Sequence, residues 1–170
     1  MGPGALGRVG VTRDRDPLTR AAGVGDAAAI ADLVRLAFST QSRPTNPPSS
    51  ALGETAATIA AHFTAGGGAV LEVDGVMVGA VLWNEEDGAL YIGRLSIHPE
   101  HRRRGFARAL VAEAEHAARR LGFTRMTLGV RLELDDNRRL FKSCGFEDKE
   151  FRSHEGFSEP TWVLMERRLT

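Results

Sequence analysis

Short apolar stretches, separated by polar turns that contain glycine, recur along the chain and predict β-strands. The strands expected at residues 69–73 and 76–83 are joined by Asp74-Gly75, a strong signal for a hairpin. A strand at residues 89–97 stops before Pro99, because proline has no N–H to give to a ladder. The other expected strands cover residues 17–22, 124–130 and 161–166, and one more begins at Gly145-Phe146.

Apolar residues that recur every three or four positions predict helices between these strands. Asp26 is a suitable N-cap for the first helix, and the three glycines at residues 66–68 are expected to form the turn that ends the second. Gly122 closes the third helix, as glycine commonly does, and Asp135 or Asp136 is expected to cap the fourth. The four helices cover residues 27–38, 51–65, 106–121 and 137–144.

The resulting order, βααβββαβαββ, predicts a mixed α/β (α+β) fold in which helices flank one twisted sheet of about seven strands. The chain has 170 residues, of which 42% are hydrophobic, so it can bury an ordinary core. Residues 17–170 are therefore expected to form one domain. Residues 1–16 carry four glycines in their first ten positions, followed by alternating charges, and are expected to be a disordered tail.

The charge balance and the cysteine content limit which binding partners and which cellular compartment are expected. Basic and acidic residues balance at 22 each, so no global charge indicates a nucleic-acid or membrane partner. The single cysteine excludes an internal disulfide and a cysteine-based zinc site, and no metal is expected. No apolar run approaches the ~20 residues that span a bilayer, and the N-terminus lacks the apolar core of a signal peptide. The expected location is cytoplasmic.

The stretch at residues 90–122 is the strongest candidate for chemistry, because it is predicted as a strand, a tight basic turn and a helix. The turn contains Arg102, Arg103, Arg104 and Gly105. A loop that enters a helix presents free backbone N–H groups and the positive end of the helix dipole. The arginines raise the local positive potential. This loop is therefore expected to bind a small anionic ligand.

Three segments resemble the GCN5-related N-acetyltransferases, the GNAT superfamily. RRRGFA at residues 102–107 fits the R/Q-x-x-G-x-G/A signature of that superfamily, and LSIHP at residues 95–99 is similar to the end of its fourth strand. NRRLFKSCGF at residues 137–146 is similar to its "N…LY…GF" segment. The loop alone would be a weak motif, but the three segments in this order are a strong combination. The resemblance covers roughly residues 18–169 and implies an acetyl-CoA-dependent N-acetyltransferase.

The resemblance also implies where acetyl-CoA, the co-substrate, would bind. In that superfamily the loop amides hold the pyrophosphate, and the preceding strand splays from the next one at a bulge, so that its backbone pairs with the pantetheine arm. A backbone N–H near Ile97 would stabilise the oxyanion, and Asn137 corresponds to an asparagine that often bonds the pantetheine. The residues implied for cofactor binding are Leu95, Ser96, Ile97, Arg102, Arg103, Arg104, Gly105, Phe106, Ala107, Arg108, Asn137 and Phe141.

The proton-transfer groups of the superfamily are missing at two positions. Phe141 stands where many members have a tyrosine acid, and phenylalanine cannot donate a proton. Gly129 stands where some members carry a glutamate base. The catalytic residues are therefore unassigned, and the candidates are Glu133, Glu72, His154 and Tyr91. Arg94, a charge within an apolar strand, is a candidate for holding an anionic substrate.

Two rival functions follow from the same residues. A non-catalytic acyl-CoA sensor on the same fold is compatible with the two missing groups, and a general nucleotide-phosphate binder would explain the arginine loop alone. The proline-rich loop at residues 39–50 is either a plain connector or a wall of the acceptor site. The acceptor is a small-molecule or peptide amine, the acyl group is acetyl or longer, and the protein is a monomer or a homodimer.

Overall fold

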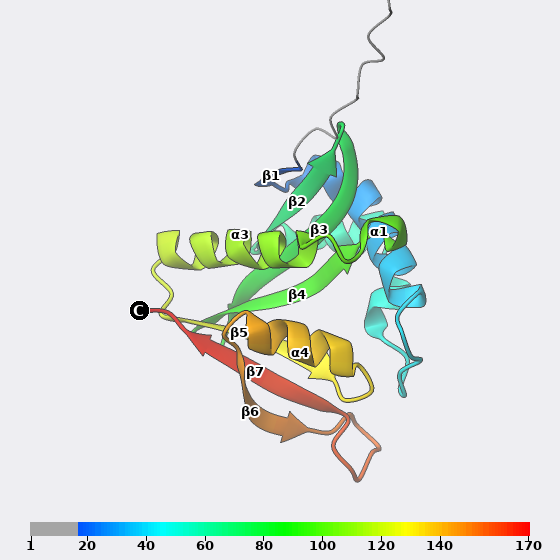
Figure 1. Ribbon diagram of the computed structural model, residues 1–170, viewed down its shortest axis with the longest axis vertical. Coiled ribbons are helices and arrows are strands. Elements are labelled where there is room, and N and C mark those ends of the chain that lie inside the picture. The colour runs from blue at the N-terminus through cyan, green and yellow to red at the C-terminus, as the bar shows by residue number, and fades with distance from the viewer. Residues whose placement is uncertain (1–16) are drawn as a thin grey trace, which may run out of the picture.

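The computed structural model describes residues 17–170, and the tail expected at residues 1–16 lies outside the described residues. The observed order of strands and α-helices is the one that the sequence predicts, with three short 3₁₀ helices added (Figure 1). The elements are β1 (Leu18–Ala21), η1 (Val24–Asp26), α1 (Ala27–Ser39), η2 (Ser50–Gly53), α2 (Ala56–His62), β2 (Gly67–Val73), β3 (Val76–Glu86), β4 (Ala89–Ile97), η3 (Pro99–His101), α3 (Phe106–Arg120), β5 (Arg125–Arg131), α4 (Asp135–Ser143), β6 (Glu147–Arg152) and β7 (Trp162–Arg168).

The seven strands form one sheet in the order β1-β2-β3-β4-β5-β7-β6. Neighbouring strands are antiparallel except β4 and β5, which run parallel. The two tight hairpins turn at Asp74-Gly75 and Asp87-Gly88, and all four of these residues have positive φ, as a type I′ turn requires. The sequence predicts the first of these hairpins from its Asp-Gly turn, and it also predicts a turn at residues 85–88 into the strand that begins at Ala89.

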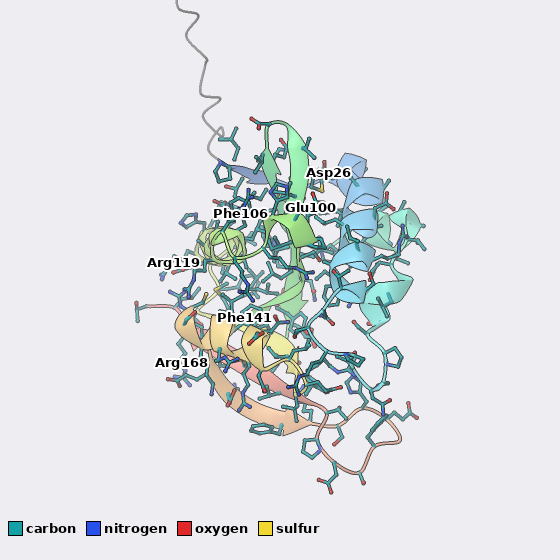
Figure 2. All side chains as sticks on the ribbon, turned by 45° about the vertical axis from the view of Figure 1, so that its right-hand side comes forward. Asp26, Glu100, Phe106, Arg119, Phe141 and Arg168 are labelled. Atoms are coloured by element: carbon teal, nitrogen blue, oxygen red, sulfur yellow. The ribbon has the colours of Figure 1, made fainter. Side chains whose placement is uncertain are left out.

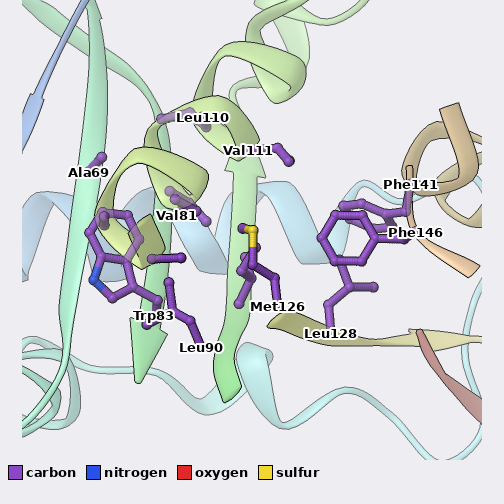
Figure 3. Packing of buried hydrophobic residues seen from close by; sticks show 14 of the residues in the cluster. Ala69, Val81, Trp83, Leu90, Leu110, Val111, Met126, Leu128, Phe141 and Phe146 are labelled. Atoms are coloured by element: carbon purple, nitrogen blue, oxygen red, sulfur yellow. The ribbon is translucent and has the colours of Figure 1, made fainter. Parts of the chain in front are cut away.

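Helices cover both faces of the sheet, because successive residues of a strand point to opposite faces. Val81 and Trp83 of β3 pack against α3, whereas Ala80 and Leu82 pack with α1 and α2. Figure 3 shows Leu110 and Val111 of α3 above the strands, and the edge-to-face pair of Phe141 and Phe146 above Leu128 of β5. One apolar layer therefore lies on each face of the sheet.

The two parallel strands at the centre stay together for only part of their length. β4 and β5 are paired from Leu90↔Met126 to Ile92↔Leu128, and no pair follows, although both strands continue. β4 bulges just beyond this point, where Arg94 and Leu95 oppose the single residue Val81 of β3. Arg94 adopts a left-handed backbone with φ 54°. The sheet therefore opens in the middle.

The second helix differs from the one expected at residues 51–65. Residues 50–53 form the 3₁₀ helix η2, and α2 begins only at Ala56. Thr55 is the N-cap of α2, and its hydroxyl accepts a hydrogen bond from the Thr58 N–H at 3.2 Å. The strong cap starts a new helix here, and the expected single helix was wrong.

The glycines at residues 66–68 also differ from the turn that was expected, because β2 already begins at Gly67. A Cβ on Gly67 would lie 2.5 Å from Trp83 Nε1, and a Cβ on Gly68 would lie 2.6 Å from the Val81 carbonyl oxygen. These glycines therefore allow β3 to approach closely.

The predicted cap of the fourth helix was wrong as well. α4 starts at Asp135, so Asp135 and Asp136 lie in its first turn and Leu134 is the N-cap. Two carboxylates in the first turn still stabilise the helix through its dipole. Within residues 17–170, none of the helices combines the length and the apolar character needed to cross a bilayer.

Candidate functional site

A cavity of about 650 Å³ fills the opening between β4 and β5. Its walls are β4, the start of α3, β5 and α4, with the end of α1 at one side. Figure 2 shows Phe106 at the start of α3 above Phe141 of α4, and both residues line this first cavity. Its lining contains five arginines and one carboxylate, Asp136, so the cavity favours an anionic ligand.

The start of α3 supplies unpaired donors to the first cavity. Gly105 is the N-cap and has φ 77°, and its carbonyl accepts the first helical bond, from the Ala109 N–H at 3.2 Å. The N–H groups of Phe106, Ala107 and Arg108 precede that bond and have no partner within the helix. Because they sit at the positive end of a helix of 15 residues, they form an anion site.

The arginines of the loop play different structural roles. Arg102 donates to the Thr40 carbonyl at 2.8 Å and to the Ala37 carbonyl at 3.1 Å, so its guanidinium caps the end of α1. Arg108 donates to Ser143 Oγ at 2.6 Å, which joins α3 to α4 across the first cavity. Arg103 lines the cavity with an exposed side chain. Arg104 is also exposed but is not part of the lining.

The edge of β4 that faces the opening has free backbone donors. The His98 N–H donates to the Val78 carbonyl of β3 at 2.8 Å. Because successive N–H groups of a strand point to opposite edges, the N–H groups of Ile97 and Leu95 point away from β3. Both residues line the first cavity, where β5 no longer pairs with β4. Ser96 is buried instead, and its hydroxyl donates to the Arg94 carbonyl at 2.9 Å.

α4 forms the wall opposite α3. Phe141 is 8% exposed and packs edge-on against Phe146, with ring centroids 6.1 Å apart. Asn137 lies one turn earlier on the helix and also lines the first cavity. Of the twelve residues expected to bind the cofactor, the structure brings ten to this cavity, and only Ser96 and Arg104 fall outside it.

A second cavity, of about 710 Å³, lies on the other side of the opening. It is bounded by β3, β4, α2, the loop before η2 and the segment between β6 and β7. The proline-rich loop reaches both cavities, the first at residues 40–42 and 49 and the second at residues 48–50. The two cavities meet at shared lining residues, which are Phe38, Ser49, Ile92, Gly93, Arg94, Gly129 and Arg131.

Gly129 lies at this junction, and neighbouring side chains fill the space beside it. A Cβ on Gly129 would lie 3.1 Å from the Trp162 ring and 3.2 Å from the Tyr91 hydroxyl oxygen. Tyr91 lines the second cavity, and burial, followed by the nearby Glu86 charge, raises the pKa of its phenol. Tyr91 is therefore protonated at neutral pH and cannot serve as a base there.

His154 is the candidate base that the structure brings to the second cavity. Its Nδ1 lies 2.5 Å from Thr161 Oγ1, and its backbone N–H donates to the same hydroxyl at 2.9 Å. Burial, followed by the Arg131 charge, lowers the pKa of the His154 imidazole below 6.5. The imidazole is therefore neutral at physiological pH and able to accept a proton.

The two glutamates considered as bases lie outside both cavities. Glu72 is on β2 and accepts a hydrogen bond from Arg20 Nε at 3.0 Å. Glu133 follows β5 and accepts a hydrogen bond from the Asn46 N–H at 2.7 Å, which ties the proline-rich loop down. Both carboxylates are therefore held by hydrogen bonds outside the two cavities.

Arg94 reaches the junction, but its charge is neutralised within the protein. Its Nε and one terminal nitrogen donate to the Glu54 carboxylate at 3.1 and 3.0 Å. The same terminal nitrogen donates to Ser50 Oγ at 3.1 Å. Arg94 therefore holds η2 and the residues before α2 against the bulge of β4, and the anion-binding role expected of it finds no support in this arrangement.

The residue that the sequence reasoning missed is Arg131, because the expected strand ended at Val130. Arg131 closes β5 and lines both cavities. No signal in the sequence distinguishes it from an ordinary charge in a connecting segment. Among the described residues, no group of three or more His, Cys, Asp or Glu side chains could hold a metal ion.

Comparison with known proteins places this geometry in a family. A family model described as the acetyltransferase (GNAT) family matches residues 30–146, which is more than half of the chain. No curated protein shows significant similarity to the sequence.

Solved structures share the fold at low sequence identity. The PaiA N-acetyltransferase of Thermoplasma acidophilum, in complex with coenzyme A, is 13% identical with a TM-score of 0.74, covering 89% of this chain and 98% of that one. The yncA protein of Salmonella typhimurium, with its cofactor acetyl-CoA, is 20% identical with a TM-score of 0.70, covering 91% and 95%. The ribosomal-protein-S18-alanine N-acetyltransferase of Escherichia coli is 16% identical with a TM-score of 0.67, covering 91% and 94%. These likenesses confirm the expected fold class.

Proposed function

The chain belongs to the acetyltransferase (GNAT) family, and we propose that it moves the acetyl group of acetyl-CoA to a primary amine by direct attack of the amine on the thioester. The observation that carries this proposal is the opening between β4 and β5, with the anion site of α3 at one end and a second cavity at the other. One substrate can enter from each side, and the two meet at the shared lining.

The first cavity fits acetyl-CoA by its chemistry. The free N–H groups of residues 106–108, with Gly105 leaving space beside them, suit the pyrophosphate. The outward N–H groups of Leu95 and Ile97 suit the amides of the pantetheine arm, which would lie along β4 like an added strand. Asn137 on α4 would bind the arm from the opposite wall. Acetyl-CoA supplies the acetyl group as an activated thioester.

The reaction requires little of the protein beyond positioning the two substrates. The amine nitrogen forms a bond to the carbonyl carbon, the C–S bond breaks, and the products are an acetylated amine and the thiol of CoA. The N–H of Ile97, free on the edge of β4, would donate to the oxyanion that forms on the carbonyl oxygen. Holding both substrates at the junction supplies much of the rate enhancement.

A proton must leave the amine, because an alkyl amine with a pKa near that of lysine, about 10.4, is mostly protonated at neutral pH. His154 would accept it, since the imidazole is neutral and lines the acceptor side. Donation from Nδ1–H to Thr161 Oγ1 would leave the Nε2 lone pair free for this role. Phe141 offers no proton at the other end, so the thiolate would leave unaided or take a proton from water.

Thiol release tests this function against the sensor alternative. The protein is mixed with acetyl-CoA and each amine of a panel, which includes amino acids, polyamines and peptides with free N-termini. Both the free thiol that is released and the acetylated amine that forms are measured. We expect release with at least one acceptor. Tight binding of acetyl-CoA without thiol release on any acceptor would favour the non-catalytic sensor instead.

We expect His154→Gln to lower kcat/KM about tenfold at pH 7 to 8. The effect falls below the usual contribution of a general base, about 10²- to 10⁴-fold, because bulk water can still accept the proton. Below the lowered pKa of His154 the wild-type imidazole is protonated and cannot act as a base, so the two proteins should converge as the pH falls through that pKa.

The matched control for this change is His116→Gln, because the His116 side chain on α3 is 68% exposed and lines neither cavity. Its pH–rate profile should coincide with that of the wild type. A His154→Gln profile parallel to the wild type at every pH would exclude His154 as the proton acceptor.

A further inference from the structure

Arg131 lies at the junction of the two cavities and makes no ion pair with a carboxylate of the described chain. Within residues 17–170, no Asp or Glu oxygen lies within 4.0 Å of its guanidinium, and its hydrogen bond is to the Pro47 carbonyl oxygen. Its Nε is buried and has no hydrogen-bond partner in the described part of the chain. Burial lowers the pKa of the guanidinium, the nearby Glu133 charge acts in the opposite direction, and the group stays charged. The side chain as a whole is only partly buried, so part of it is open to the two cavities that it lines.

The other charged groups around the second cavity are already paired. Glu54 is bound by Arg94, so this pair contributes no net charge to the cavity. Arg152 pairs with Glu150 at 2.9 Å and lies over the Trp162 ring. The remaining positive charge that lines the second cavity therefore belongs to Arg131.

The rest of the second cavity is partly apolar. Phe38, Ile59, Leu82, Ile92 and Trp162 line it, and its volume of about 710 Å³ suits a small molecule. A ligand that is complementary to this lining has an apolar body and one anionic group. The guanidinium fork suits a carboxylate, which it can bind through two parallel hydrogen bonds.

We propose that the acceptor is a small amine that carries a carboxylate close to its amino group, as an α-amino acid does, and that Arg131 binds this carboxylate. The inference rests on the proposed acetyl transfer. Because Arg131 lines both cavities, a carboxylate bound there lies beside the place where the amine meets the thioester. A long polyamine has no anionic group that the Arg131 guanidinium could bind. Its own positive charges are repelled by that guanidinium, so it is disfavoured as an acceptor.

Matched acceptors test this proposal on the wild-type protein. The common L-amino acids are compared, each with its own amide and its own decarboxylated amine, by free thiol release. We expect the best amino acid to exceed its amide in kcat/KM by about 10- to 100-fold, the range of a hydrogen bond to a charged group. Intrinsic reactivity works in the opposite direction, since an amino group beside an amide has a pKa of only about 8 and is more often neutral.

Two variants assign the preference to Arg131. Arg131→Gln should lower kcat/KM for the amino acid about 10- to 100-fold, chiefly through KM, and lower the value for the amide by a much smaller factor. Arg131→Lys keeps the charge but loses the fork, so an intermediate loss is expected. Acetyl-CoA affinity and the unfolding midpoint, measured for each variant, show whether the site is intact.

The outcomes separate the inference from the function that it rests on. Amides or decarboxylated amines used as well as the amino acids, or an Arg131→Gln variant that loses acid and amide activity by the same factor, would overturn the carboxylate inference while acetyl transfer stands. Acetylation confined to peptides would do the same. No thiol release from any amine, with acetyl-CoA still bound, would overturn the transferase function and this inference together.

Discussion

Replacing Gly105 with Asp should weaken acetyl-CoA binding by about 100-fold or more, without unfolding the protein. Gly105 is the N-cap of α3, and the space around its missing Cβ is open. An aspartate at an N-cap accepts bonds from the first N–H groups of the helix, so it would occupy the proposed pyrophosphate donors and repel the phosphates. The strain of a side chain at φ 77° is mild for aspartate, which tolerates this region. Isothermal titration with acetyl-CoA measures the loss.

Two control variants separate charge from backbone strain. Gly105→Asn has the same shape without the charge, so a smaller loss, about tenfold, is expected. Gly156→Asp introduces the same side chain at a similar φ, 84°, with open space around it, but between β6 and β7 and outside both cavities. It should bind acetyl-CoA like the wild type. An unchanged affinity of Gly105→Asp would reject the loop as the pyrophosphate site.

Truncating Phe146 should cost about 3–5 kcal/mol of the free energy of unfolding, the range for a buried phenylalanine changed to alanine. Phe146 is 1% exposed and packs on Phe141, and both belong to the same core as the buried residues of α3 (Figure 3). Phe141 is the buried residue of the short helix α4, whose other residues are polar apart from Leu140. The cavity left by Phe146→Ala therefore also loosens the wall that carries Asn137. Urea unfolding measures the change.

The control is Phe151→Ala on β6, because that ring is 50% exposed. Its contact with the Arg138 guanidinium, 5.4 Å from the ring centroid, is an exposed cation–π contact, so the expected loss is about 1 kcal/mol or less. If Phe146→Ala cost no more than Phe151→Ala, the packing of α4 on the sheet would not depend on Phe146.

Local chemistry was enough to predict most of the fold. The Asp74-Gly75 turn, Pro99 after β4 and the apolar spacing of α3 each act within a few residues, so the sequence shows them directly. The sequence-based prediction failed where contacts between distant parts of the chain determine the local structure. Gly67 is a strand residue because Trp83 lies against it, and the close approach of a partner strand cannot be read from three consecutive glycines.

The cofactor side of the site was more predictable than the acceptor side. A loop, a helix start and a strand edge are continuous in sequence, so residues 95–108 could be identified together. The roles of the arginines depend on partners far away in the chain. Arg94 meets Glu54 forty positions earlier, and Arg102 meets the end of α1 more than sixty positions earlier. Arg131 meets the Pro47 carbonyl, more than eighty positions earlier, and makes no ion pair with a carboxylate of the described chain, which no sequence pattern reveals.

The amount of thiol released before and after an amine is added tests the central claim most directly. The protein is mixed with a stoichiometric amount of acetyl-CoA, and the release of free thiol is followed over time. An accepted amine is then added, and the products are identified by mass spectrometry. Direct transfer predicts no release before the amine, and one acetylated amine for each thiol after it. Thiol released before the amine, with the acetyl group found on the protein, would contradict direct attack, and bound acetyl-CoA with no thiol at any stage would contradict catalysis itself.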